Sequence, residues 1–193
     1  MNAKQHRPRH LNRRTLAAGD WLTLEEIEYV DHAGRKRTWE TSARQGRGGA
    51  VFMITKLQPS ERYVLVRQYR PPMDAYVLEF PAGLVDPGED PEQTAVRELL
   101  EETGYTGTIT WLGPQALTSP GMTREGVTLA IMVVDEQAEE NLHPEQTCEE
   151  SEDIEVILKT AVELPAYLRK CWDSGVHLDS RLVAFFLGEG IRW

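Results

Sequence analysis

The stretch that decides the fold of this 193-residue chain is residues 83–105, G-L-V-D-P-G-E-D-P-E-Q-T-A-V-R-E-L-L-E-E-T-G-Y. The D-P-G at residues 86–88 predicts a tight turn. Asp90 followed by Pro91 is typical of a helix start, with Asp90 as the N-cap and proline at the first helical position. Apolar residues at helical spacing then predict a helix over residues 90–103.

Three glutamates of this helix, Glu98, Glu101 and Glu102, are spaced i, i+3 and i+4 and therefore project from one face. Their like charges repel one another, which lowers helix stability. One interpretation is a solvated acidic face. The other is a site for a hard divalent cation, because clustered carboxylate oxygens suit Mg²⁺, which commonly bridges carboxylates and substrate phosphates. The turn before the face and Gly104 after it favour the metal site.

The same segment matches the Nudix box, G-x5-E-x7-R-E-U-x-E-E-x-G-U, in which U is an aliphatic residue. Tyr105 replaces the final aliphatic residue, which affects packing and not chemistry. The chain therefore resembles the Nudix hydrolases. The resemblance implies an α/β/α sandwich with a mixed β-sheet, and hydrolysis of nucleoside diphosphates linked to another moiety with Mg²⁺ or Mn²⁺. The matching positions are Gly83, Glu89, Arg97, Glu98, Leu99, Glu101, Glu102 and Gly104.

The resemblance also implies roles for individual residues of the metal site. A structural ion pair is expected between Glu89 and Arg97. Glu79 is assigned either to an ion pair or to the outer shell of the metal. The expected metal ligands are Glu98, Glu101, Glu102 and the backbone carbonyl of Ala82.

Sequence outside the box resembles the ADP-ribose and ADP-sugar pyrophosphatase branch of this superfamily. It includes Q-Y-R-P-P at residues 68–72, L-E-F-P-A-G at residues 78–83 and Pro120, sixteen residues after Gly104. The resemblance covers roughly residues 19–188. It implies a homodimer that hydrolyses ADP-ribose to AMP and ribose 5-phosphate. Another ADP-sugar, GDP-mannose or an oxidised nucleoside diphosphate stays open as the substrate, as does a Nudix module that binds without turnover.

The nucleotide is expected to meet aromatic and basic residues. In the relatives, two tryptophans from different subunits enclose the adenine, and Trp21 and Trp39 match them. Stacking on a base is favourable by about 1–3 kcal/mol, although each Trp could instead pack on its own sheet. Glu40 and Arg44 follow at the spacing of relatives whose residues bind the adenine and approach the phosphates.

Two further residues are assigned to the diphosphate and the distal sugar. The planar guanidinium of Arg70 matches phosphate oxygens; an ordinary ion pair is the alternative. Ser119 agrees with a bacterial-like Ser-Pro-Gly pattern, where some eukaryotic relatives place an acidic residue on the terminal ribose.

A general base is expected on the acidic loop before the last strand. Hydrolysis requires a water that is positioned and deprotonated near phosphorus. Glu152 is the assignment, because residues 154–156 align with the strand that follows the loop in relatives. Glu149 and Glu150 remain alternatives, and most acids of this loop are expected to be solvated.

The domain organisation is predicted in three parts. Residues 1–14 are basic and almost free of apolar side chains, which indicates a disordered tail. Residues 15–46 contain two extended runs around a turn at residues 31–35, which predicts a β-hairpin module used in dimerisation. The remaining residues, 47–193, form the Nudix domain of mixed α/β class, with box 83–105.

Charge and composition exclude other classes of protein. The net charge of −10 argues against nucleic-acid binding, which depends on cationic contacts to phosphates. Apolar runs are far shorter than the roughly 20 residues that span a bilayer, and no apolar N-terminal run indicates a secretory signal. Two isolated cysteines, Cys148 and Cys171, favour a reducing compartment. We therefore expect no membrane partner and a cytoplasmic location, or a nuclear one if the source is eukaryotic.

Overall fold

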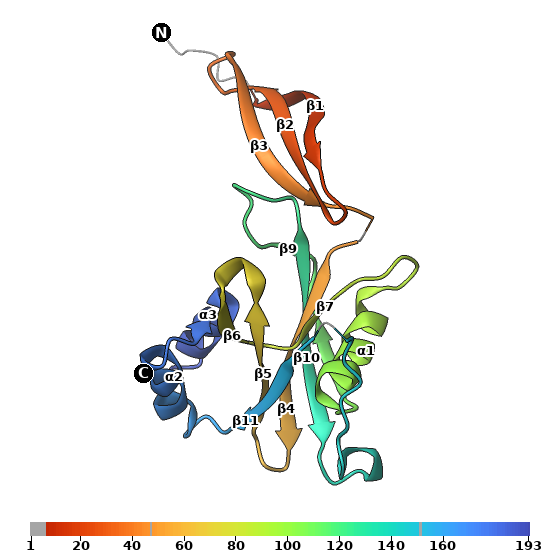
Figure 1. Ribbon diagram of the computed structural model, residues 1–193, viewed down its shortest axis with the longest axis vertical. Coiled ribbons are helices and arrows are strands. Elements are labelled where there is room, and N and C mark those ends of the chain that lie inside the picture. The colour runs from red at the N-terminus through yellow and green to blue at the C-terminus, as the bar shows by residue number, and fades with distance from the viewer. Residues whose placement is uncertain (1–6, 47, 151) are drawn as a thin grey trace. The chain divides into compact units, whose positions relative to one another are not determined.

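The computed structural model describes residues 7–46, 48–150 and 152–193, which divide into two compact units (Figure 1). The first unit comprises Met1–Gly49 and Gln115–Val127, and the second comprises Ala50–Pro114 and Thr128–Trp193. No helix in the described part of the chain combines the length and apolar composition needed to cross a bilayer.

An antiparallel sheet of three strands forms most of the first unit, in the order β1 (Arg9–Ala18), β2 (Leu22–Val30) and β3 (Lys36–Arg44). The predicted hairpin is present as β2 and β3, which pair over their full length. Its turn is closed by Asp31, whose carboxylate accepts hydrogen bonds from the backbone N–H groups of Ala33 and Arg35. This Asp supplies the local hydrogen bonds that its sequence position predicts.

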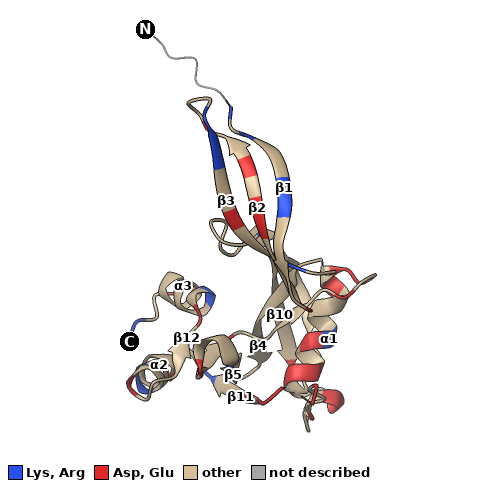
Figure 2. Cartoon of the chain, turned by 45° about the horizontal axis from the view of Figure 1, so that its top comes forward, with Lys and Arg blue, Asp and Glu red and all other residues tan. Residues whose placement is uncertain are grey.

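The first strand corrects the prediction of a disordered tail over residues 1–14. Residues 1–6 lie outside the described residues, whereas Arg9 to Arg14 belong to β1 and pair with β2. Every residue of β1 is exposed, so no apolar alternation marks it. The backbone ladder and the ion pairs Arg13–Glu25 and Arg14–Glu26 hold it instead. Figure 2 marks basic residues on β1 in blue and acidic residues on β2 in red.

The boundary of the first unit also differs from the prediction, which assigned residues 47–193 to one domain. The segment 115–127 belongs to the first unit: its strand β9 (Ala116–Leu117) pairs with Val127 and Gly126, and Thr123 forms a bridge with Ser42 of β3. The backbone N–H of Ser42 and the hydroxyl of Thr41 both donate to the carbonyl of Met122. These contacts join segments about 80 residues apart, a relationship that local patterns do not encode.

A mixed sheet forms the centre of the second unit, in the order β12-β6-β5-β4-β10-β8, with β7 paired to β4 and β11 paired to β5. The pairing of β12 with β6 is parallel. The strands are β4 (Ala50–Gln58), β5 (Tyr63–Arg70), β6 (Ala75–Glu79), β7 (Ala82–Leu84), β8 (Thr108–Leu112), β10 (Gly126–Asp135), β11 (Ile154–Lys159) and β12 (His177–Leu178).

Helices cover both faces of this sheet (Figure 1). Helix α1 (Pro91–Thr103) packs on one face, where Ala95 and Leu99 are fully buried against β4 and β10. Helices α2 (Leu164–Asp173) and α3 (Ser180–Gly188) pack on the other face over Leu65 and Leu78. Short 3₁₀ turns lie at η1 (Pro71–Met73) and η2 (Glu139–Asn141). The resulting α/β/α layering agrees with the predicted fold class.

The ends of α1 are set by its sequence. The Asp90 carboxylate accepts from the backbone N–H of Gln93, and the Gln93 side chain accepts from the N–H of Asp90, which is a complete capping box. At the other end Gly104 adopts φ 74° and its N–H donates to the carbonyl of Leu100. The predicted helix, its N-cap and its terminating glycine are therefore confirmed.

Candidate active site

Three glutamates of the box, Glu98, Glu101 and Glu102, lie on α1 beside the short strand β7. Glu98 fits there only because residue 83 is glycine: a Cβ on Gly83 would lie 1.8 Å from the Glu98 carboxyl carbon. The backbone N–H of Ala82, also on β7, donates to Oε2 of Glu102 at 3.0 Å. Strand and helix thus approach closely enough for backbone atoms of one to contact carboxylates of the other. Figure 2 marks the acidic residues along α1 in red.

Arg97 connects the loop before α1 with two of these glutamates. Its Nε and Nη2 donate to the two carboxylate oxygens of Glu89 at 2.9 and 2.8 Å. Its Nη1 lies 2.9 Å from both Glu98 Oε1 and Glu101 Oε2. The hydrogen bonds from Arg97 lower the pKa of Glu89 to about 2. The structural ion pair expected between Glu89 and Arg97 is present.

Glu102 is the most deeply buried carboxylate of the face, with 2% of the residue exposed. Burial raises its pKa to about 8, and Glu98 and Glu152 add to the increase, while the Ala82 N–H opposes it. Burial also raises the pKa of Glu98. Ionising Glu102 in this environment is therefore unfavourable, whereas for Glu98 the neighbouring Arg97 opposes the increase.

These residues fit a divalent cation by their chemistry. A bound cation would offset the cost of ionising the buried carboxylates, and oxygen donors suit Mg²⁺. Within the described residues no three acidic, His or Cys side chains already form a ligand cage. Arg97 contacts one carboxylate oxygen of Glu98 and one of Glu101, and the Ala82 N–H contacts one oxygen of Glu102, so a cation would use the second oxygen of each group.

The acidic loop that was expected to carry a base is fixed to the end of α1. The Gln146 side-chain amide donates to the carbonyls of Glu102 and Ile154, at 2.6 and 3.0 Å, and the N–H of Thr147 donates to the carbonyl of Glu101. Glu152 acts electrostatically on Glu98 and Glu102, since its charge raises the pKa of both. Glu152 therefore lies in the electrostatic surroundings of the carboxylate face.

Gln146 was not singled out from the sequence. A glutamine within an acidic loop has no local signal. Its role is visible only once residues 102 and 154 are known to be neighbours.

Arg70, assigned to phosphate, forms a two-pronged ion pair with Glu79 in this structure. Its Nε and Nη2 lie 2.7 and 2.9 Å from the two Glu79 oxygens. Glu79 is almost fully buried, and Arg181 Nη2 lies 4.0 Å from it. The ion-pair alternatives for Arg70 and Glu79 are thus the ones present. Arg181, which the sequence did not single out, gives a second guanidinium at this carboxylate.

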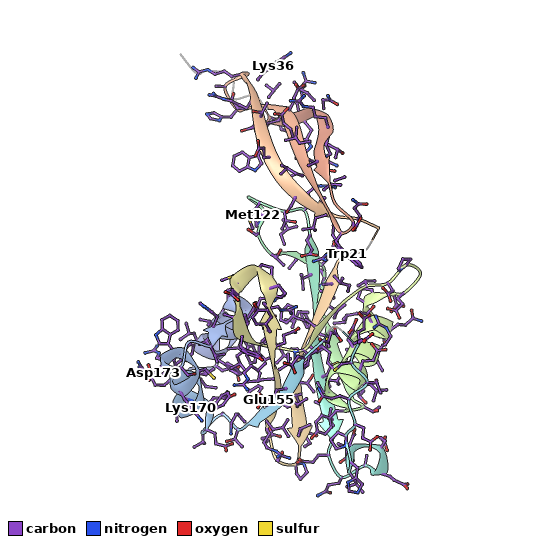
Figure 3. All side chains as sticks on the ribbon, viewed as in Figure 1. Trp21, Lys36, Met122, Glu155, Lys170 and Asp173 are labelled. Atoms are coloured by element: carbon purple, nitrogen blue, oxygen red, sulfur yellow. The ribbon has the colours of Figure 1, made fainter. Side chains whose placement is uncertain are left out.

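The two tryptophans assigned to the adenine belong to the first unit and are both exposed. Trp21, labelled in Figure 3, lies between β1 and β2 with 67% of its surface exposed. Trp39 lies on β3, is 50% exposed, and donates through Nε1 to the carbonyl of Gly121 at 2.9 Å. Neither side chain is buried in the sheet of its own unit.

The other residues assigned to the substrate also lie in the first unit. Arg44 forms an ion pair with Glu125 at 2.7 Å. Glu40 is exposed on β3, opposite Glu26. Ser119 is partly buried, and its carbonyl accepts hydrogen bonds from the N–H groups of Met122 and Thr123, which closes the loop after β9. The second unit contains the remaining residues of the predicted site, which are Arg70, Ala82, Glu98, Glu101, Glu102 and Glu152.

Comparison with known proteins decides the family, because residues 46–170 match the family model described as NUDIX domain. The chain belongs to the Nudix hydrolase family. The ADP-ribose pyrophosphatase of Saccharomyces cerevisiae is 34% identical over 170 residues, which cover 84% of this chain and 74% of the yeast protein. The ADP-sugar pyrophosphatase of Mus musculus is 38% identical over 149 residues, covering 74% and 68%.

A solved structure is similar to this Nudix chain over nearly its whole length. The crystal structure of an ADP compounds hydrolase superposes with a TM-score of 0.67 at 23% identity, covering 96% of this chain and 94% of that chain. At this identity the likeness concerns the fold. The predicted family and fold class are confirmed.

Proposed function

We propose that this Nudix hydrolase cleaves the pyrophosphate bond of ADP-ribose, giving AMP and ribose 5-phosphate, with Mg²⁺ as its cofactor and Mn²⁺ as a substitute. The observation that carries the proposal is the carboxylate face of α1, where Glu102 is buried with a raised pKa beside Glu98. The yeast and mouse relatives, named for ADP-ribose and ADP-sugar hydrolysis, support the choice of substrate class.

In this proposal Glu98, Glu101 and Glu102, with the Ala82 carbonyl, hold the metal. When bound, the metal stabilises the negative charge that develops on the diphosphate. Arg97 orients Glu98 and Glu101 through its shared Nη1 and anchors them to Glu89. Arg70 binds a phosphate oxygen with the part of its guanidinium that Glu79 does not use.

Glu152 accepts the proton of the attacking water. Its support is the electrostatic coupling to Glu98 and Glu102, together with a loop that Gln146 ties to the end of α1. Glu149 contacts Glu152 by donating its backbone N–H to the Glu152 carboxylate.

The adenine is placed between Trp21 and Trp39 of two subunits of a homodimer, with Glu40 and Arg44 nearby and Ser119 toward the distal sugar. The exposure of both indole rings supports this assignment, since a buried ring would not be available for stacking. The location proposed for this enzyme is the cytoplasm.

A substrate panel tests the proposal. ADP-ribose, ADP-mannose, ADP-glucose, GDP-mannose and an oxidised nucleoside diphosphate are compared at equal concentration with Mg²⁺, and products are resolved by chromatography. The highest kcat/KM is expected for ADP-ribose. A higher kcat/KM for GDP-mannose or the oxidised nucleoside diphosphate would refute the assignment of ADP-ribose as the substrate. If none of the compounds were hydrolysed, the proposed pyrophosphatase activity would be refuted.

A further inference from the structure

A pocket lies in the second unit between β11 and α2. It has a volume of about 330 Å³, which is large enough for a small ligand. Its lining comes from β5, β11 and α2, and Figure 3 shows Glu155 on β11 and Lys170 on α2, with Asp173 farther along the helix. The lining residues include Arg67, Glu155, Lys159, Tyr167, Lys170 and Cys171.

The pocket is on the face of the sheet opposite to α1. Arg67 alternates along β5 with Val64, whose side chain packs in the core under α1 and which lies on the opposite side of the strand from Arg67. Leu65, on the same side of the strand as Arg67, packs in the core under α2 and α3 instead. The carboxylate face of α1 is therefore separated from this pocket by the sheet.

Three cations and one carboxylate line this pocket, in a chain whose net charge is −10. Arg67 pairs with Glu155 through Nη2, whereas its Nε is buried and has no hydrogen-bond partner among the described residues. A buried guanidinium N–H without an acceptor is unfavourable. The Arg67 side chain as a whole is 37% exposed and lines the pocket, where its charge would attract an anion.

The two lysines form no salt bridge within the described residues, although the charge of Lys159 acts on Glu163. Lys159 places its Nζ 5.2 Å from the centre of the Tyr167 ring, and within the described residues neither Lys159 nor Lys170 lies in a salt bridge with a carboxylate. Strand β11 pairs with β5 only, in the part of the sheet that is described, so N–H groups on its other edge are not used by the sheet. The pocket thus offers ammonium, guanidinium and backbone donors.

We propose that this pocket binds a phosphate group, as inorganic phosphate or as the phosphate of a small phosphomonoester, between Arg67, Lys159 and Lys170. A dianion matches the net charge of +2 that remains after Glu155 is subtracted from the three cations. The Tyr167 ring and the aliphatic part of β11 form the wall against which the rest of a phosphomonoester would lie. The site does not depend on the metal or on the reaction proposed above.

The test is a titration of the full-length protein with inorganic phosphate in EDTA, at ionic strength held constant with NaCl, followed by amide chemical shifts. EDTA keeps divalent cations from recruiting phosphate to α1. Saturable shifts are expected at residues 155–159 and 167–174, with a Kd on the order of 1 mM. AMP and ribose 5-phosphate are titrated in parallel to separate free phosphate from a phosphomonoester as the preferred source.

Matched variants decide whether the lysines are responsible. Lys170→Gln and Lys159→Gln should each weaken binding by about fivefold or more, because each removes one charge-assisted contact. Arg169→Gln is the control, since Arg169 is exposed on the same helix and does not line the pocket. No saturable binding up to about 20 mM, shifts confined to α1, or equal binding by Lys170→Gln and Arg169→Gln would each overturn the proposal.

Discussion

The backbone N–H of Ala82 donates a hydrogen bond to Oε2 of Glu102, with 3.0 Å between the two atoms. This bond joins β7 to α1 at the most buried carboxylate of the Nudix box. It partly offsets the cost of burial, yet the pKa of Glu102 is still raised to about 8. Glu102 is therefore a carboxylate that favours either a proton or a cation.

Replacing this carboxylate should remove activity and leave the fold intact. Glu102→Gln retains an acceptor for the Ala82 N–H and loses the negative charge, so metal affinity should fall. Activity should decrease by at least about 100-fold. Mutating a residue that only supports a metal ligand costs about 10- to 100-fold, and Glu102 is itself a proposed ligand. Glu101→Gln should behave similarly. Circular dichroism checks folding, and Glu92→Gln, on the first turn of α1, is the control that should keep full activity.

The raised pKa of Glu102 predicts a pH dependence of stability without metal. The folded state keeps this proton at pH values where the unfolded chain, with an ordinary pKa of 4.5, has lost it. The contribution to the free energy of unfolding is therefore present below pH 4.5 and is lost as the pH rises through 8. Urea unfolding in EDTA should show a decline over this range that Glu102→Gln lacks.

Mg²⁺ should reverse that trend, because it binds the deprotonated carboxylate. Thermal stabilisation by a fixed Mg²⁺ concentration is expected to grow between pH 6 and pH 8.5, roughly centred on the pKa of about 8. Equal stabilisation at both ends of this range would show that Glu102 does not ionise on metal binding.

The Glu89–Arg97 ion pair predicts the opposite pH dependence. Since the hydrogen bonds from Arg97 lower the pKa of Glu89 to about 2, its contribution to stability is present above pH 4.5 and is lost as the pH falls toward 2. Glu89→Gln should be less stable than the parent at neutral pH, and the difference should shrink in acid. Denaturant unfolding at several pH values measures it; a difference independent of pH would contradict the assignment.

Glu152 is predicted to act in turnover and not in substrate affinity. Glu152→Gln should lower kcat by about 10²–10⁴-fold, the range for loss of a general base, and leave KM nearly unchanged. The pH–rate profile should lose the limb that the base produces. Glu150→Gln serves as the matched control on the same loop. If Glu150→Gln lost turnover and Glu152→Gln did not, the base would be reassigned.

Trp39 is predicted to contribute to nucleotide affinity. Trp39→Ala should raise KM for ADP-ribose by about 5- to 150-fold, corresponding to 1–3 kcal/mol of stacking, with a smaller effect on kcat. Trp39→Phe keeps an aromatic ring and should recover most of the affinity. It loses only the hydrogen bond from Nε1 to the Gly121 carbonyl. An unchanged KM in Trp39→Ala would place the adenine elsewhere.

Local chemistry explains which elements the sequence predicts. Asp90 and Gly104 delimit α1 through side-chain capping and a left-handed backbone, both of which depend on the residue itself. The shared face of Glu98, Glu101 and Glu102 is likewise recognisable from spacing alone. Strand β1 carries no comparable signal, because all its residues are exposed and its ion pairs are with β2.

Relationships between distant residues account for what the sequence left open. Arg70 could be assigned to phosphate or to an ion pair, and only the pairing of β5 with β6 brings Glu79 within 2.7 Å of it. The contact of Trp39 with Gly121 spans 82 residues. The pocket between β11 and α2 combines Arg67 with lysines about 90 and 100 residues later in the chain. No local motif specifies any of these.

Product analysis with ADP-ribose tests the central claim most directly. The purified protein is incubated with ADP-ribose and Mg²⁺, with EDTA, and as the Glu102→Gln variant with Mg²⁺, and nucleotides are resolved by chromatography. AMP and ribose 5-phosphate in equal amounts are expected from the first reaction, and neither product above background from the other two. Absence of AMP at micromolar enzyme with Mg²⁺, or equal AMP from the Glu102→Gln variant, would contradict the account.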